Sequence, residues 1–599
     1  MNGSGPKPGM GAQVHEHGCS FRVWAPHAEA VTVRVTGDNE SPRETPLAQE
    51  GNGYWAGDVA GVKAGARYRF VLSLPGGESR ERIDPYAMDV THSAGEGVVV
   101  DHDCFDWRGD DFDMAPHNEL VIYELHVGSF APEGDGPGTL HDAQGQLAHL
   151  KRLGINAVQI MPVAEFAGDL SWGYNPAHIF AVESSYGGPD ALKRFVRACH
   201  CHGIAVILDV VYNHFGPSDL DLWQFDGWSE NGGGGIYFYN DHRGETPWGK
   251  TRPDYGRPEV RQFIRDNALM WLSDYHIDGL RLDMTLYIRS IGGAGGDDLP
   301  DGWRLMQWVN DEVRKLPGRH ITIAEDLRNY AGMTADTAHG GAGFNTQWDA
   351  SFVHPVRAAV IEQSDERRSM LAVQQAITQR YNDDGFRRVV YSESHDEVAN
   401  GRARVPYEID PGNATSWFSQ KRSTLAAALV FTVPGIPMIF QGQEFLQGEW
   451  FRDDVPLDWD LNEEFSGIVR LYRDLIHLRR NLGGVTAGLM GQFVTVHHIN
   501  DDMNMLAFQR WEKHGHGDDV VVVMNFSNAT RENYMIGMPV AGRWRVRLNS
   551  DSHHYSRDFG NAPLADLVAQ AQAYDGMPAA AQVTIPPYSF VILSQDRND

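Results

Sequence analysis

The residues best suited to chemistry lie in the segment DGLRLDM, residues 278–284. The segment has the pattern of a short buried strand, in which Leu280 and Leu282 alternate with Arg281 and Asp283. Burying an arginine or a carboxylate without a partner is costly, so such groups are normally paired or put to use. We interpret Asp283 as a candidate nucleophile that Arg281 keeps ionised. A buried ion pair that only fixes strand register is the alternative that this segment alone leaves open.

Three other predicted strands also end in polar residues that an ordinary core would exclude. Their endings are DVVYNH (Asp209, Asn213, His214), IAEDL (Glu325, Asp326) and SESHDE (His395, Asp396). Because the parallel strands of a barrel bring their carboxyl ends to one rim, we expect these side chains to share a pocket with DGLRLDM. Carboxylates together with histidines and an arginine suit glycoside hydrolysis or transfer, whose oxocarbenium-like transition state needs a negative neighbour and a proton donor.

A metal site is the rival interpretation of one of these endings. Asp209, Asn213 and His214 could include ligands for a cation that prefers oxygen. Their spacing matches no HExxH or CxxC motif, so we expect no catalytic metal. We also expect no required cofactor; a structural calcium stays possible, although nothing in the sequence indicates one.

The elements that must position these residues alternate as strand and helix from Leu120 onward. Eight apolar strands with eight intervening helical segments predict a parallel (β/α)₈ TIM barrel, and hence the α/β fold class, over residues 111–485. The segment 215–253, rich in Gly, Trp and Tyr, is too long for an ordinary connection. We predict that it is a loop insert over the active-site face.

Two regions of short alternating strands flank the predicted barrel. Residues 13–110 predict an N-terminal β-sandwich, immunoglobulin-like and of the carbohydrate-binding type, for which binding and structural packing are both open. Residues 486–599 predict a C-terminal antiparallel β-sandwich that caps the barrel. Residues 1–12, rich in Gly and Pro, predict a disordered tail.

Composition limits the partners of the chain. A formal net charge of −29 over 599 residues argues against nucleic acid or an anionic membrane and suits a neutral ligand. No run of 18 or more apolar residues occurs, and the four cysteines give no disulfide framework. We expect a cytoplasmic monomer or dimer.

The four polar segments carry a family resemblance. DVVYNH, GLRLDM, IAED and SHDE resemble, in order, the four signature regions of the alpha-amylase superfamily of glycoside hydrolases, and the resemblance extends from Phe21 onward. It implies that Asp283 is the nucleophile, Glu325 the general acid/base and Asp396 the third carboxylate of a retaining mechanism that passes through a covalent glycosyl-enzyme intermediate. It further implies the following substrate-binding and supporting residues: Tyr174, Trp172, His214, Arg281, His395, Asp209 and Asn213.

The sequence favours one member of the superfamily without excluding others. ESHDEVANGRARVP and FQGQEFLQGEWF resemble branching enzymes, whereas VIYELHVGSFAPEG and TPWGK resemble maltooligosyltrehalose trehalohydrolases. We expect an enzyme of the 1,4-alpha-glucan branching type that acts on an α-1,4-glucan or maltooligosaccharide. A trehalohydrolase or an alpha-amylase is the alternative, and a non-catalytic glucan-binding protein is a remote one.

Overall fold

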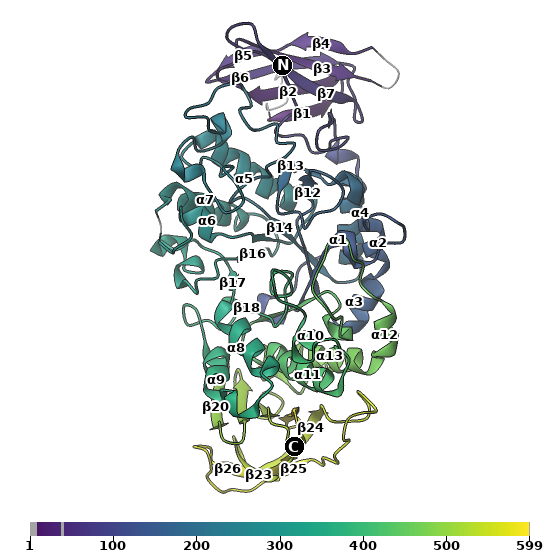
Figure 1. The fold of residues 1–599 in the computed structure, drawn as a ribbon, viewed down its shortest axis with the longest axis vertical. Coiled ribbons are helices and arrows are strands. Elements are labelled where there is room, and N and C mark those ends of the chain that lie inside the picture. The colour runs from purple at the N-terminus through teal and green to yellow at the C-terminus, as the bar shows by residue number, and fades with distance from the viewer. Residues whose placement is uncertain (1–8, 38–40, 297, 598–599) are drawn as a thin grey trace.

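The computed structural model describes residues 9–37, 41–296 and 298–597. Figure 1 shows an elongated molecule with the N-terminal strands at one end, a barrel in the middle and the C-terminal strands at the other end. The predicted α/β class with flanking β-domains is confirmed, because the central strands form a closed barrel and both ends form antiparallel sheets.

Eight parallel strands close the barrel in chain order. Most are short and fully buried, as expected for strands that have side chains packed on both faces. They are β10 (Ile122–Leu125), β11 (Ala157–Ile160), β14 (Ala205–Val210), β15 (Gly279–Leu282), β16 (Ile321–Ala324), β17 (Thr346–Trp348), β18 (Arg388–Val390) and β19 (Ile436–Phe440).

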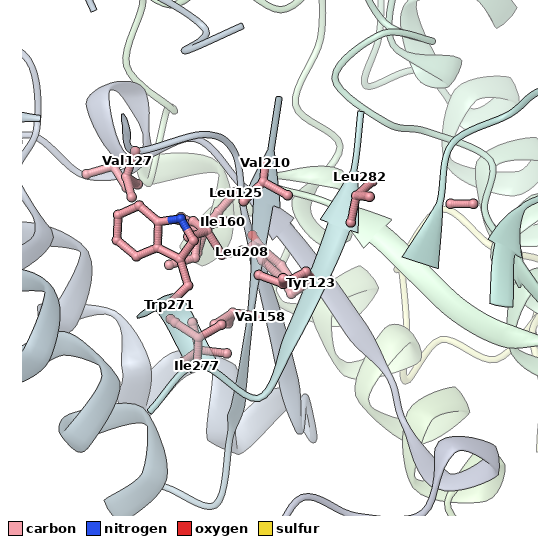
Figure 2. Close-up of a cluster of buried hydrophobic side chains, with 14 of the residues drawn as sticks. Tyr123, Leu125, Val127, Val158, Ile160, Leu208, Val210, Trp271, Ile277 and Leu282 are labelled. Atoms are coloured by element: carbon pink, nitrogen blue, oxygen red, sulfur yellow. The ribbon is translucent and has the colours of Figure 1, made fainter. Parts of the chain in front are cut away.

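Helices cover the outside of the barrel. Trp271 of α5 packs in one apolar cluster with Leu208 and Val210 of β14 and Leu282 of β15 (Figure 2). The helices are α1 (Val127–Phe130), α2 (Leu140–Gly145), α3 (Leu147–Leu153), α4 (Gly188–Cys201), α5 (Pro258–Ser273), α6 (Leu286–Arg289), α7 (Pro300–Val313), α8 (Ala350–Ile361), α9 (Met370–Thr378), α10 (Val405–Ile409), α11 (Trp417–Thr432), α12 (Asp460–Glu464) and α13 (Ser466–Arg479).

One expected helical segment is replaced by turns. Within the described chain, the connection from β16 to β17 contains only the 3-10 turns η6 (Ala331–Met333) and η7 (Thr337–His339), whereas α8 and α9 both follow β17. The prediction of eight intervening helical segments was therefore wrong at this connection. Gly332, Gly340, Gly341 and Gly343 lie there, and glycine is unfavourable in a helix interior.

Two inserted segments extend from the barrel near the site. A hairpin of β12 (Ala164–Phe166) and β13 (Pro176–Val182) follows β11. The insert 215–253 follows β14 and closes at its neck, where the Phe215 N–H donates to the Thr251 carbonyl at 3.2 Å and the Thr251 Oγ1 donates to the Phe215 carbonyl at 2.5 Å. The two ends of the insert thus lie side by side next to His214.

Two sheets form the N-terminal domain, as predicted for a sandwich. One contains β1 (Gly11–His15), β2 (Gly18–Trp24), β6 (Tyr54–Ala60) and β5 (Ala48–Gly51), and the other β4 (Arg43–Pro46), β3 (Ala30–Thr36), β7 (Arg67–Ser73) and β8 (Ser79–Arg82), with β9 (Gly97–Val98) paired to β7. The predicted tail was too long: residues 1–8 lie outside the described residues, but Gly11 and Ala12 pair with Arg22 and Phe21.

The C-terminal strands also form two sheets. The larger contains β20 (Phe493–Asn500), β21 (Met505–Trp511), β22 (Val520–Asn525), β27 (Ser589–Ser594), β24 (Gly542–Asn549) and β25 (Leu567–Ala569), and the smaller β23 (Arg531–Met538) and β26 (Ala579–Ile585). Among the helices of the described residues, none is both long enough and apolar enough to span a bilayer.

Candidate active site

Strand register places the central residues of the site next to one another. In the parallel pair β14–β15, Asp209 lies opposite Arg281. Asp283 directly follows β15, and the Glu325 N–H, directly after β16, donates to the Leu282 carbonyl at 3.1 Å. The parallel ladder therefore brings Asp209 and Arg281, together with the carboxylates of Asp283 and Glu325, to one rim of the barrel.

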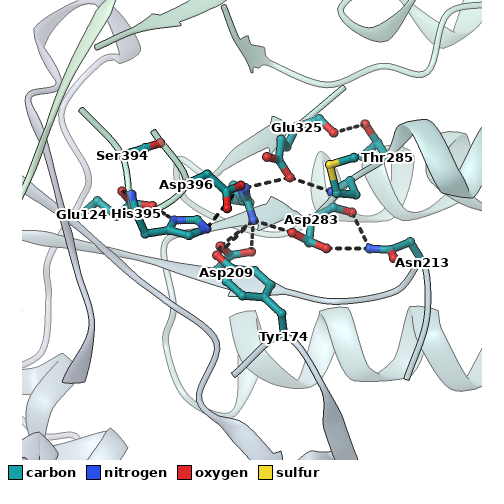
Figure 3. Close-up of polar contacts among 12 residues, drawn as sticks. Glu124, Tyr174, Asp209, Asn213, Asp283, Thr285, Glu325, Ser394, His395 and Asp396 are labelled. Atoms are coloured by element: carbon teal, nitrogen blue, oxygen red, sulfur yellow. Dashed lines mark hydrogen bonds and ion pairs between the residues drawn. The ribbon is translucent and has the colours of Figure 1, made fainter. Parts of the chain in front are cut away.

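The Arg281 guanidinium contacts three carboxylates. Figure 3 shows these carboxylates, which belong to Asp209, Asp283 and Glu325. Its Nη1 lies 2.6 Å from Asp209 Oδ2 and 3.1 Å from Asp283 Oδ1, and its Nη2 lies 2.8 Å from Glu325 Oε2. The Trp348 ring lies 4.3 Å from the guanidinium carbon. Burial by itself lowers the pKa of Arg281, but the carboxylates together raise it well above its usual value. This cation therefore stays charged and links Asp283 to Glu325.

Asn213 and His214 fix the other side of Asp283. The Asn213 Nδ2 donates to Asp283 Oδ2 at 2.7 Å and to the Asp283 carbonyl at 3.0 Å. With the amide nitrogen thus used, Asn213 Oδ1 accepts from His214 Nδ1 at 2.5 Å. Burial lowers the pKa of His214 to about 4, against the opposing effect of Asp283. The ring is therefore neutral, and its buried Nε2, which has no hydrogen-bond partner within the described chain, is an acceptor.

Glu325 has the environment of a proton donor. Its Oε2 accepts from the Met284 N–H at 2.9 Å, while its Oε1 is buried and has no hydrogen-bond partner among the residues described. Burial raises the pKa of Glu325 well above its usual value, and Asp283 and Asp396 raise it further, against the lowering effect of Arg281. Such a carboxyl is protonated near neutral pH and can give its proton to a bound leaving group.

His395 and Asp396 complete the rim. His395 Nδ1 lies 2.7 Å from Glu124 Oε1, and its Nε2 lies 3.7 Å from Asp396 Oδ2. Burial lowers the pKa of His395, but Glu124 and Asp396 outweigh that effect and raise it to about 9. The Asp396 side chain is 42% exposed, so it faces solvent at the edge of the cluster. The site thus has a buried cationic wall and an open carboxylate.

All ten predicted site residues lie in this one cluster. The two not yet placed come from the loop between β12 and β13. Tyr174 Oη donates to Asp209 Oδ2 at 2.5 Å, and its ring stacks on His395 with centroids 5.0 Å apart. Trp172 meets the same histidine edge-on, with centroids 5.8 Å apart.

Trp248, Trp348 and Glu124 also contact this cluster and were not predicted as site residues. Trp248, from the insert, stacks on His214 with centroids 4.6 Å apart and an interplanar angle of 13°. Trp348 lies against Arg281, and Glu124 holds His395. A carboxylate inside an apolar strand marks Glu124 in the sequence, whereas nothing local marks Trp248.

The electrostatics of the pocket favour sharing of protons. Its carboxylates outnumber Arg281 and His395, and burial raises the pKa of Glu325 and of Asp209. Burial raises the pKa of Asp209 to about 7, with Arg281 acting in the opposite direction. Across residues 9–37, 41–296 and 298–597, no group of three or more His, Cys, Asp or Glu side chains is arranged to hold a metal ion.

Three family models match successive parts of the chain. Residues 9–87 match carbohydrate-binding module 48, the isoamylase N-terminal domain, and residues 125–224 match the alpha amylase catalytic domain. Residues 495–596 match the alpha amylase C-terminal all-beta domain. In chain order, the three matches fall in the N-terminal β-domain, the barrel and the C-terminal β-domain.

Relatives and solved structures extend the match to nearly the whole chain. The 1,4-alpha-glucan branching enzyme of Corynebacterium jeikeium is 32% identical over 97% of this chain and 82% of that protein, and that of Marinobacter nauticus 30% identical over 98% and 95%. A putative alpha amylase from Salmonella typhimurium shares the fold, with a TM-score of 0.76 at 22% identity over 98% of this chain and 99% of that one. A pullulanase from Anoxybacillus in complex with maltotetraose does so with a TM-score of 0.77 at 22% identity, over 98% and 88%. The chain therefore belongs to the alpha-amylase superfamily and, within it, to the family of the 1,4-alpha-glucan branching enzymes.

Proposed function

We propose that this protein is a retaining 1,4-alpha-glucan branching enzyme. The observation that carries the proposal is the Arg281 guanidinium, which contacts both Asp283 and Glu325 and so brings the candidate nucleophile and the candidate proton donor to one site. A retaining mechanism uses such a pair of carboxyls, one as nucleophile and one as acid and base. The family of the chain favours a glucan as donor and acceptor.

The proposed first step cleaves an α-1,4 bond of the donor glucan. The Asp283 carboxylate attacks the anomeric carbon while the protonated Glu325 gives its proton to the leaving glycosidic oxygen. A covalent glycosyl-enzyme intermediate forms, and the reducing-end part of the donor leaves. Arg281 and Asn213 hold Asp283 for the attack.

The proposed second step forms the branch. The 6-hydroxyl of an acceptor glucose attacks the intermediate, Glu325 takes the proton of that hydroxyl, and Asp283 is released. Protonated His395, Asp396 and the free Nε2 of His214 are proposed to hold sugar hydroxyls in both steps. Attack by water in place of the 6-hydroxyl would make the same site a hydrolase.

The test is incubation with amylose. Proton NMR of the anomeric region measures new α-1,6 linkages, and a reducing-end assay measures hydrolysis. We expect α-1,6 signal to grow with little gain in reducing ends. Rising reducing ends without α-1,6 signal would overturn the branching proposal, and maltooligosyltrehalose, with free trehalose as product, would then separate a trehalohydrolase from an amylase.

We also propose that the enzyme acts in the cytoplasm. Cys104 and Cys201 are free and exposed, and a reducing compartment would keep such thiols from oxidising.

A further inference from the structure

The insert 215–253 meets the N-terminal sandwich through a fully buried carboxylate. The Asp226 side chain has no solvent exposure, and its Oδ2 accepts from the His27 N–H at 2.9 Å and lies 2.7 Å from His27 Nδ1. The His27 ring also stacks on Trp228, with centroids 4.8 Å apart and an interplanar angle of 8°. A buried carboxylate needs such donors. Those closest to Asp226 Oδ2 come from the sandwich, across a separation of 199 residues.

Further contacts extend this junction, which we define by His27, Arg82 and Ser93 on the sandwich and Asp219, Asp221 and Asp226 on the insert. The Arg82 Nε donates to the Phe225 carbonyl at 3.0 Å, and the Ile83 N–H donates to Asp221 Oδ2 at 2.7 Å. Ser93 Oγ donates to Asp219 Oδ2 at 2.8 Å. Three carboxylates of the insert are thus held by donors of the sandwich.

The insert transmits this anchorage toward the site through its own hydrogen bonds. The Gln224 N–H donates to the Gly234 carbonyl at 2.8 Å, and the Asn240 side chain bonds the Gly235 N–H and carbonyl at 3.0 and 2.9 Å. Arg252 Nη1 donates to the Arg243 carbonyl at 2.7 Å. The path from the junction to the neck is therefore held by hydrogen bonds at successive steps.

The far side of the insert contacts the active site and the segment that follows β15. Trp248 covers His214, and Arg252 Nη2 donates to the Ile291 carbonyl at 2.8 Å, just after α6. Trp248 also meets Tyr287 of α6 edge-on, with centroids 5.2 Å apart. The insert thus supplies the ring that covers His214.

The two tryptophans of the sandwich strands are buried. Trp24 and Trp55 are 6% and 7% accessible, whereas Tyr54, Phe105 and Trp107 are half-buried. The contacts of the sandwich with the insert are therefore the ones that link this domain to the active site.

We propose that the N-terminal sandwich is a positioning element for the side of the active site that Trp248 covers, with His27 and Asp226 as positioning residues that act through Trp248. The inference rests on the proposed function, because it concerns how the intermediate is shared between a sugar hydroxyl and water. A loosened junction lets Trp248 move off His214, and the water that then enters competes with the acceptor hydroxyl for the intermediate.

The test uses the full chain with His27→Ala, Asp226→Asn and the double variant. Hydrogen–deuterium exchange of residues 240–253 is expected to speed up roughly tenfold in each, because the segment loses its anchor. The ratio of new α-1,6 linkages to new reducing ends is expected to fall roughly three- to tenfold. Since both residues act in one contact, the double variant should match the single variants.

Tyr68→Phe is the matched control. Tyr68 Oη lies 2.8 Å from Asp84 Oδ2 inside the sandwich, so its loss weakens the domain while the contact between His27 and Asp226 stays in place. Unchanged exchange in residues 240–253, an unchanged product ratio, or an equal change in Tyr68→Phe would overturn the inference. Absence of α-1,6 product from the wild-type enzyme would instead refute the branching proposal, and the exchange measurement would still decide whether the sandwich holds the insert.

Discussion

Glu124→Gln should shift the pH range in which the enzyme works. Glu124 Oε1 lies 2.7 Å from His395 Nδ1, and it is the larger of the two carboxylate influences that raise the pKa of His395 to about 9. Without that charge, the opposing effect of burial dominates and the pKa of His395 falls to its ordinary value of about 6.5 or lower. At pH 7.5 such a group is protonated in roughly one molecule in ten or fewer.

The expected result is a loss of kcat/KM on amylose of roughly tenfold or more at pH 7.5, with partial recovery toward pH 6. The assay is initial-rate release and transfer of glucan over pH 5.5–9.5 for both proteins. In the wild type, loss of the His395 proton should not limit activity until the pH approaches the pKa of this residue, about 9. In Glu124→Gln it should move toward acid.

The free energy of unfolding should also depend on pH through the contact between Glu124 and His395. The pKa of His395 is higher in the folded protein than in the unfolded chain, so the interaction stabilises the fold fully below about pH 6.5 and is lost as the pH rises through about 9. The contribution is about 3 kcal/mol, at about 1.4 kcal/mol for each unit of pKa. The deficit of Glu124→Gln in thermal unfolding should therefore shrink as the pH rises.

Glu444→Gln is the control for this prediction. Glu444 is another buried carboxylate paired with a histidine, 3.0 Å from His149 Nε2, but it lies outside the site. An alkaline limit that is the same in Glu124→Gln and the wild type, or an equal shift in Glu444→Gln, would refute the reasoning.

Three substitutions test the proposed steps. Asp283→Asn should lower turnover of amylose roughly 10⁴-fold or more while glucan binding, measured by affinity electrophoresis, persists; near-normal turnover would exclude the nucleophile role. Glu325→Gln should lose cleavage of amylose but still be glycosylated by an α-maltosyl fluoride, whose leaving group needs no proton; equal losses on both donors would contradict the acid role. Arg281→Lys should lower kcat/KM roughly 10²-fold or more, because one ammonium cannot contact all three carboxylates as the guanidinium fork does; an unchanged rate would mean that the fork is dispensable.

The sequence allowed the barrel and its rim to be predicted because the relevant signals are local. Leu280 and Leu282 alternate with Arg281, and strand alternation alone then decides which side chains enter the barrel. The parallel ladder does the rest, since Asp209 and Arg281 become neighbours once their strands pair.

The features that were not predicted depend on long-range folding of the chain or on local residue types, which the periodicity of the sequence does not describe. Trp248 reaches His214 only because the insert folds back to its own neck. Glu124 is one charged residue in an apolar strand, and its partner, His395, lies 271 residues away. The turns η6 and η7 stand where repetition predicted a helix, because local glycines outweighed the expectation from the barrel.

The closed neck of the insert bears on how this enzyme could be redesigned. Hydrogen bonds between Phe215 and Thr251 hold the two ends of the insert together. The insert is therefore joined to the barrel at the same two points whatever residues lie between them. Doubling the length of a flexible loop between fixed ends costs only about 0.6 kcal/mol. The insert is therefore suited to grafting: segments exchanged between His242 and Lys250, beyond the residues that meet the sandwich, would change the side chain that covers His214 while the catalytic barrel stays the same.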